Sequence, residues 1–125
     1  MELRKIHEDQ RGFIYLVKDL LENNKEFTFL EIKKGLARGG CYHTKNENFV
    51  VIKGKVKVIC GSKTWEAIQG DSGTFPAFEP HAFEALEDSI VSEWGITTEE
   101  KERDVKNPEL RKIIDEINNK GASIR

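Results

Sequence analysis

The sequence predicts an all-β domain that ends in a single α-helix. Short apolar or alternating runs of strand length recur along the first three quarters of the chain, with glycine and proline turn signals between them. One apolar stripe with helical spacing is confined to the C-terminal end. A chain of 125 residues has the usual size of one domain. Regular short strands at this spacing predict a closed or sandwiched antiparallel sheet.

The expected strands are rich in β-branched or aromatic residues and are bounded by turn signals. Gly54 is expected to form a tight reversal between two of them, since glycine readily adopts positive φ. In the strand after this turn, Val56, Val58 and Cys60 alternate with more polar neighbours, which predicts that Cys60 belongs to the core. A further turn is expected at 35–40. In chain order the expected strands are 13–17, 26–33, 41–43, 47–53, 55–60, 64–68, 82–86 and 89–94.

The C-terminal part of the sequence changes character. Residues 97–106 are strongly charged and are expected to form a solvent-exposed connection. Asn107 then supplies a helix cap, Pro108 suits the first helical position, and Gly121 is the expected stop. The expected apolar face consists of Leu110, Ile113, Ile114 and Ile117. We therefore expect a β-domain at 1–96, with a charged connection and a helix at 97–125 packed on the same domain.

The charge balance narrows the class of partner. The formal net charge is −2, from 20 basic and 22 acidic residues that are interspersed, which argues against nucleic acid as the partner. No run approaches the length of a membrane span, and the first residues lack the apolar core of a signal peptide. We therefore expect no membrane partner, a cytoplasmic location, and reduced thiols at Cys41 and Cys60.

Three residues predict a metal site: His43, Glu47 and His81. On a β-hairpin His43 would end one strand and Glu47 would begin the next, so both side chains could point into one cavity. His81 follows a proline-containing turn, on a strand that a barrel could place opposite. Two imidazoles and one carboxylate suit zinc, manganese, iron or nickel and leave positions open for substrate. By spacing alone, the three could equally be scattered surface residues.

The residues around this trio follow two spaced motifs. In the first, Cys41, His43 and Glu47 stand between two glycines; in the second, a proline precedes His81. This pattern resembles the two signature motifs of the cupin superfamily, with cysteine in place of the first histidine. The residues that occupy motif positions are Gly35, Cys41, His43, Glu47 and Gly54, then Gly70, Pro76 and His81, with Phe78 and Ala85 replacing the usual glycine and asparagine.

The resemblance implies a double-stranded β-helix, the cupin jelly-roll barrel, with a divalent metal on His43, Glu47 and His81. Zinc is the first expectation, and iron, manganese or nickel are the alternatives. Cys41 stands where the superfamily places a fourth ligand. It could complete a mixed site, fill the core as an inert thiol, or act as a reactive thiol.

A narrower resemblance covers residues 38–47, which are similar to a segment of cupin domains that act on nucleotide sugars, such as the C-terminal domain of bifunctional capsular-polysaccharide enzymes. Residues 9–13 are similar to the first strand of dTDP-4-dehydrorhamnose 3,5-epimerases. The resemblance implies that Arg38 meets a nucleotide phosphate; otherwise Arg38 is an exposed loop charge. It also implies proton abstraction next to a ketone, with His43 or Cys41 as the catalytic group.

The resemblance leaves the activity open. A sugar or nucleotide-sugar epimerase or isomerase is one hypothesis, a non-heme iron dioxygenase is a second, and a non-enzymatic module that binds a small molecule is a third. Phe78 and Trp94 are expected to bind a base or sugar ring, or else to belong to the barrel core. By resemblance, the protein is expected to form a homodimer through exposed sheet edges.

Overall fold

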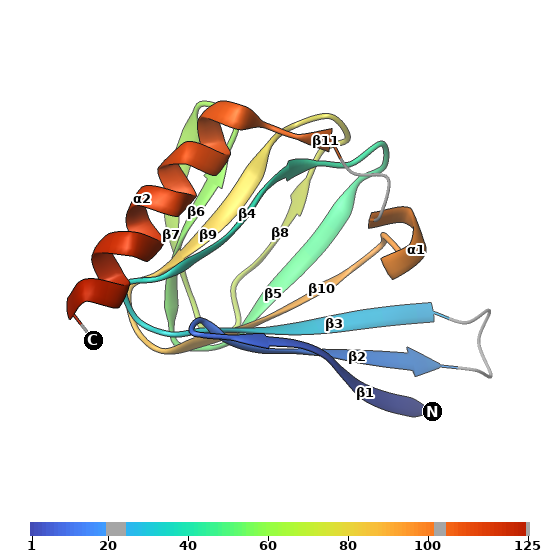
Figure 1. Ribbon diagram of the computed structural model, residues 1–125. Coiled ribbons are helices and arrows are strands. Elements are labelled where there is room, and N and C mark those ends of the chain that lie inside the picture. Colours follow the sequence, from blue (N-terminus) through green and yellow to red (C-terminus); the bar gives the residue numbers. More distant parts are fainter. Residues whose placement is uncertain (20–24, 102–104, 125) are drawn as a thin grey trace.

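The computed structural model describes residues 1–19, 25–101 and 105–124, with no side-chain description for 122–124, and these residues form two antiparallel β-sheets (Figure 1). The six-stranded sheet has the order β1-β2-β3-β10-β5-β8, and the five-stranded sheet has the order β11-β4-β9-β6-β7. The strands are β1 (Glu2–Asp9), β2 (Gly12–Asp19), β3 (Lys25–Ile32), β4 (Ala37–Tyr42), β5 (Glu47–Lys53), β6 (Lys55–Cys60), β7 (Lys63–Ile68), β8 (Ser72–Phe75), β9 (His81–Ala85), β10 (Ser89–Trp94) and β11 (Val105–Lys106). The predicted all-β fold with one long C-terminal helix is confirmed.

The core lies between the two sheets. Three phenylalanines form its centre: Phe49 stacks on Phe75 with ring centroids 4.9 Å apart, and Phe83 packs edge-on against Phe49 at 5.1 Å. Val56 and Val58 are fully buried on the inward face of β6, and Cys60 packs partly buried against the same cluster, as the alternation predicts. Burial of large apolar side chains from both sheets supplies the main favourable term for folding.

Helix α2 (Pro108–Ile124) covers the outer face of the smaller sheet (Figure 1). Leu110 and Ile114 pack with Ala37 and Ala82 in a second buried cluster. Asn118 fixes the helix to β4, because its Oδ1 accepts a hydrogen bond from the Ala37 amide at 2.7 Å and its Nδ2 donates one to the Ala37 carbonyl at 3.1 Å. The small side chains of β4 and β9 therefore let the helix pack close to the sheet.

The structure corrects two expectations about this helix. Ile113 points outward with 47% of its surface exposed, so it does not share the buried face of Leu110 and Ile114. The predicted stop at Gly121 is wrong, since α2 continues through this residue. A Cβ at Gly121 would lie 2.4 Å from the carbonyl oxygen of Gly35 and 2.6 Å from Leu36 Cδ2. Glycine is therefore required for close approach to the barrel rather than as a cap.

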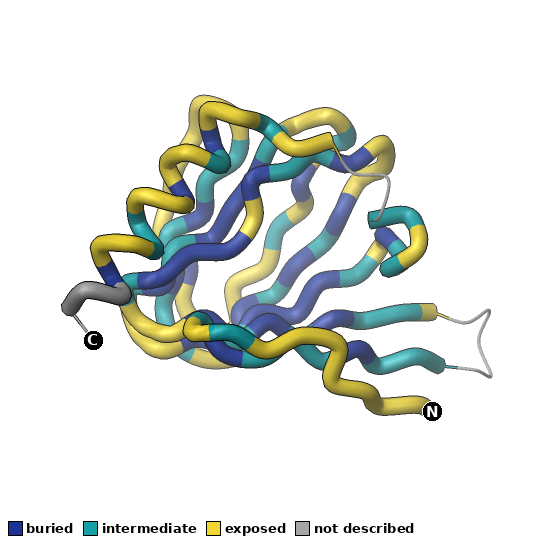
Figure 2. Tube along the Cα trace, viewed as in Figure 1, coloured by how far each residue is buried: buried dark blue, intermediate teal, exposed yellow. Residues whose placement is uncertain are grey.

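Strands β1, β8 and β11 and the short helix α1 (Thr98–Lys101) were not predicted. β1 is an edge strand, and Figure 2 shows it exposed along nearly its whole length. A strand with no buried face has no apolar alternation, so the hydrophobic pattern could not reveal it. β11 and α1 lie inside the stretch expected to be an irregular connection. No helix in the described part of the chain is long and apolar enough to cross a membrane.

Candidate metal centre

The three predicted ligands come from strand ends that meet in the interior. His43 directly follows β4, while Glu47 opens β5 and His81 opens β9. The loop between β4 and β5 is held by the loop between β8 and β9, because the Ala77 amide donates a hydrogen bond to Asn46 Oδ1 at 2.9 Å and the Phe78 amide donates one to the His43 carbonyl at 2.8 Å. The expected β-hairpin is wrong, because β4 and β5 belong to different sheets, and the loop that joins them directs both side chains inward.

The side chains converge on one carboxylate oxygen. His43 Nε2 lies 3.1 Å and His81 Nε2 lies 3.3 Å from Glu47 Oε1. The candidate ligand atoms of the three residues all lie within 4.8 Å of one another. The exposed fractions of His43, Glu47 and His81 are 8%, 1% and 5%. The group predicted from sequence is therefore assembled as a buried candidate metal-binding site.

The donor atoms of this group fit a metal ion. His81 Nδ1 lies 3.0 Å from the Glu79 carbonyl oxygen, which can only accept a hydrogen bond, so Nδ1 carries the proton. In the neutral ring Nε2 then carries a lone pair and faces Glu47 Oε1, which is also an acceptor. The contact is satisfied in two ways: a protonated ring donates a hydrogen bond to Oε1, or a cation is bound by both atoms in place of that proton. A backbone carbonyl on the second ring nitrogen is also the usual way in which proteins orient a metal-ligating histidine.

Two further charged residues, which sequence reasoning missed, lie beside Glu47. Lys101 Nζ is 3.1 Å from Glu47 Oε2 and 3.3 Å from Glu93 Oε1. Burial alone would raise the pKa of Glu47, but hydrogen bonds with His43 and His81 and the Lys101 charge outweigh it, so its pKa lies well below the usual range. Burial raises the pKa of Glu93 to about 7, although the Lys101 charge opposes this shift. For Glu93, the signal available in the sequence was a glutamate at an inward-facing position of β10.

The candidate ligands line a cavity of about 240 Å³ inside the barrel. Cys41 also lines it, and in strand register Cys41 pairs with His81 on the neighbouring strand. Cys41 is not part of the group of three converging donors found among the described residues. No disulfide joins Cys41 and Cys60 in the structure, and their reduced state remains a prediction.

Phe78 and Trp94, the two aromatic residues predicted to contact a ligand, lie outside the lining of the metal-site cavity. Phe78 is 64% exposed, adopts a φ of 70°, and has its ring 6.2 Å from that of Tyr42. Trp94 packs against Phe27 at 6.2 Å and lines a separate cavity near the start of β3. Among the described residues, neither side chain is part of the lining of the metal-site cavity. Their predicted contact with a ligand remains a prediction.

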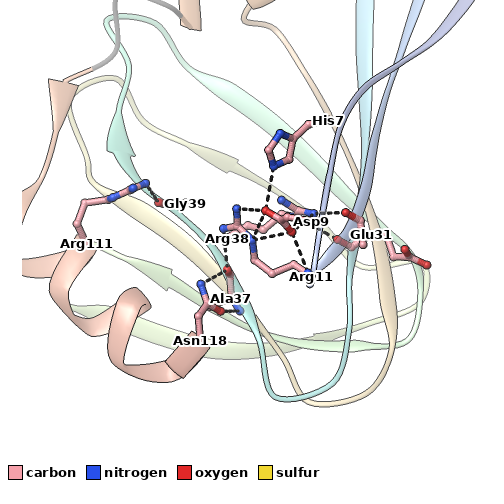
Figure 3. Close-up of polar contacts among 10 residues, drawn as sticks. His7, Asp9, Arg11, Glu31, Ala37, Arg38, Gly39, Arg111 and Asn118 are labelled. Carbon is pink, nitrogen blue, oxygen red and sulfur yellow. Dashed lines mark hydrogen bonds and ion pairs between the residues drawn. The ribbon is translucent and has the colours of Figure 1, made fainter. Parts of the chain in front are cut away.

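Arg38 is held inside a polar network rather than exposed (Figure 3). Its Nε donates to the Glu31 carbonyl at 2.9 Å, its Nη2 donates to the Gly12 carbonyl at 3.0 Å, and Nη2 lies 3.6 Å from Asp9 Oδ1. Burial lowers the pKa of Arg38 to about 10. With 5% of its surface exposed, the alternative of an exposed loop charge is wrong. Arg38 ties the first hairpin to β3 and β4 at the rim of the cavity.

Asp9 is the acidic centre of this network. Arg11 donates to Asp9 through its backbone amide at 2.8 Å and through its guanidinium, and His7 Nε2 lies 2.9 Å away (Figure 3). Burial would raise the pKa of Asp9, but the hydrogen bonds with Arg11 and His7 and the charge of Arg38 more than offset it. The pKa of Asp9 is therefore well below its usual range.

We expect Asp9→Asn to lower the free energy of unfolding by about 1.5 kcal/mol at pH 7, because charge-assisted hydrogen bonds are lost. A carboxyl whose pKa is depressed by folding contributes its full stability above the unfolded-state pKa, near 3.9, and loses it as the pH falls further. Urea titrations at pH 7 and pH 3 should therefore show the gap between wild type and variant narrowing in acid. Glu8→Gln, which breaks an exposed pair with Lys5, is the control expected to change little. A gap of equal size at both pH values would contradict this role of the Asp9 charge.

Comparison with known proteins agrees with this geometry. The family model described as a cupin domain matches residues 28–94. No curated protein matches the sequence. Among solved structures, the fold is similar to Bacillus subtilis oxalate decarboxylase, in a study of its Mn(II) centres, with a TM-score of 0.70 and 18% identity over 84% of this chain and 30% of that chain.

A structure of CapF with the inhibitor 3-isopropenyl-tropolone is also similar, with a TM-score of 0.67 and 21% identity over 85% of this chain and 34% of that chain. The capsular polysaccharide assembling protein CapF from Staphylococcus aureus gives a TM-score of 0.63 and 22% identity, covering 79% and 31% of the two chains. This chain spans about a third or less of these structures, and identities at this level show a shared fold. Because the family match covers more than half of the chain, the protein belongs to the cupin domain family.

Proposed function

We propose that this cupin binds one divalent metal ion through His43 Nε2, Glu47 Oε1 and His81 Nε2, and that a small polar ligand binds beside the ion in the barrel cavity. The convergence of these three buried donors within 4.8 Å carries the proposal. A bound divalent ion supplies Lewis-acid polarisation of a ligand oxygen. The protein's own residues fix the direction of the imidazoles and exclude bulk water from the site.

The ligand class that we propose is a sugar or the sugar part of a nucleotide sugar, processed by epimerisation or isomerisation. The fold shared with CapF, described as a capsular polysaccharide assembling protein, supports this choice. A cavity of about 240 Å³ suits a single ring, while ligand pockets for larger molecules usually exceed 300 Å³. A nucleotide would therefore extend outside the barrel. A phosphate contact with Arg38 would require part of its present network to open.

Within this proposal, Cys41 takes one of two roles. It lines the cavity opposite His81, so its sulfur could act as a fourth ligand or as a proton carrier. His43 can serve as a base only in protein without the metal, since a ligated Nε2 has no lone pair to offer. The zinc-first expectation rests on this mixed nitrogen, oxygen and sulfur donor set.

A second candidate function is oxidative or decarboxylating chemistry at iron or manganese. Two histidines and one carboxylate form the donor set of many non-heme iron oxygenases. The shared fold with oxalate decarboxylase, studied for its Mn(II) centres, supports this alternative. The two candidates differ in the metal required and in whether dioxygen is consumed. The third possibility, a module that binds a ligand without turnover, would show neither reaction.

The deciding experiment is plasma mass spectrometry of untagged protein, followed by assays of the metal-loaded form. We expect about one equivalent of a divalent metal. Zinc together with solvent-deuterium incorporation into a 4-keto nucleotide sugar would support the epimerase type. Iron or manganese with oxygen uptake or carbon dioxide release would favour the second candidate. Protein that takes up no metal after reconstitution would overturn the proposal.

The predicted homodimer also belongs to this proposal. β1 lies at the end of its sheet, so its outer edge has no neighbouring strand among the described residues. Leu3 and Ile6 are exposed on it. A long exposed edge favours pairing with a second copy. Sedimentation equilibrium tests this, and a monomer at high micromolar concentration would contradict it.

A further inference from the structure

Lys101 is a half-buried cation at the metal site that the proposed function does not use. It is the last residue of α1, in a stretch that the sequence predicts to be solvent-exposed. Only 24% of its side chain is exposed. It lines the same cavity as His43 and His81. Its ammonium lies between two buried carboxylates, 3.1 Å from Glu47 Oε2 and 3.3 Å from Glu93 Oε1. A lysine buried at this level needs such partners.

The position of Lys101 is set by contacts of α1 that lie outside the cavity. The amide and hydroxyl of Thr98 donate to Glu26 Oε1 at 3.0 Å and 2.8 Å. Lys45 Nζ lies 2.5 Å from Glu100 Oε2, which attaches α1 to the loop between His43 and Glu47. Figure 1 shows α1 beside the end of β10. Because α1 is attached at these points, the Lys101 side chain is directed at Glu47.

The two oxygens of Glu47 consequently have different surroundings. Oε1 faces both imidazoles, whereas Oε2 faces the Lys101 ammonium. We propose that Lys101 is a positioning residue of the metal centre: it holds Oε2 away from the ion, so that Glu47 ligates through Oε1 alone. This inference rests on the proposed metal binding.

The proposed arrangement has a chemical consequence. A carboxylate that binds through both oxygens occupies two coordination positions, and one that binds through a single oxygen leaves a position for ligand. The Lys101 charge also repels a divalent ion and offsets the negative charge of Glu93, so metal affinity is lower than the donors alone would give. Lys101 therefore lowers the metal affinity and at the same time leaves one coordination position of the ion open for a ligand.

The test is a titration of metal-depleted protein with Co²⁺, whose visible absorption reports coordination number and geometry. In Lys101→Met we expect Oε2 to turn toward the ion, since a buried carboxylate oxygen without a partner is costly. The visible bands should weaken and shift as the coordination number rises. The Co²⁺ affinity should increase roughly tenfold because a like charge is removed.

Three variants serve as controls. Lys5→Met removes a lysine of an exposed ion pair with Glu8 on β1, away from α1 and from Glu47, and it should leave the spectrum and affinity unchanged. Lys101→Arg keeps the charge and should restore the wild-type spectrum. If Lys101→Met folds poorly because two acids lose their cation, the double variant Lys101→Met/Glu93→Gln removes one acid with it and preserves the expected spectral change.

The outcomes separate this inference from the proposed function. Wild-type protein that binds no Co²⁺ would overturn the metal centre and this inference with it. Normal binding with unchanged bands and affinity in Lys101→Met and in the double variant would overturn the role of Lys101 alone. Weaker Co²⁺ binding in both variants would also overturn it, because Lys101 would then support the ion rather than restrict Glu47.

Discussion

His43→Ala is expected to weaken metal binding by at least about a hundredfold, because it removes one of three converging donors, and changes to residues outside the ligand set already cost ten- to a hundredfold. The loss of metal affinity can be measured as a loss of metal-dependent stabilisation against unfolding. At a metal concentration of about 100 times Kd, the ion stabilises the wild-type protein by about 2.7 kcal/mol. The same concentration would stabilise a variant with hundredfold weaker binding by about 0.4 kcal/mol. Thermal unfolding with and without metal measures both values.

His7→Ala is the matched control for this prediction. His7 is an exposed histidine on β1 whose Nε2 lies 2.9 Å from Asp9 Oδ2, outside the cavity. We expect it to lose nothing of the metal-dependent stabilisation. Because each variant is compared with itself at two metal concentrations, a change in intrinsic stability does not disturb the result. Equal stabilisation of His43→Ala and wild type would show that the ion binds elsewhere.

The metal-site residues could be predicted because their spacing follows the strand pattern. The short loop between His43 and Glu47, which joins strands of two different sheets, and the turn before His81 are local features that the sequence reveals through glycine and proline positions. Their convergence depends on the barrel, which the resemblance implied and the structure confirms. Glu93 is different. Its side chain faces inward, but a single glutamate in a strand does not indicate which residue it pairs with.

Other parts of the site depend on contacts between distant segments. Lys101 reaches the cavity because α1 is attached to Glu26 and Lys45, and charge composition alone suggested a solvated stretch. The burial of Arg38 depends on carbonyl groups of Gly12 and Glu31, whose positions follow from strand pairing. β8 also escaped prediction, because Ser72 and Thr74 point outward and Gly73 has no side chain to pack. Local patterns therefore identify ligands better than the residues that hold them.

The second large effect is expected at Gly39, in β4 beside the site. The register between β4 and β9 shifts between Gly39 and Cys41, which pair with Ala82 and His81 respectively, so β4 holds one extra residue there. Gly39 has a φ of 122°, a conformation that residues with a side chain rarely adopt. A Cβ at this position would lie 2.6 Å from the His81 carbonyl oxygen and 2.7 Å from Ala82 Cα. Both neighbours are backbone atoms of a central strand.

We expect Gly39→Ala to lower the free energy of unfolding by about 4 kcal/mol, because backbone strain and a clash with β9 add. Gly70→Ala is the matched control: its φ is 91°, but a Cβ there meets nothing within 4 Å, so only strain of about 1–2 kcal/mol remains. Urea denaturation of both variants measures the difference. Metal affinity should fall in Gly39→Ala and stay unchanged in Gly70→Ala, since displacement of β9 moves His81. Equal destabilisation of the two variants would mean that β9 shifts to accommodate the methyl group. The close contact between β4 and β9 would then have no part in fixing the position of His81.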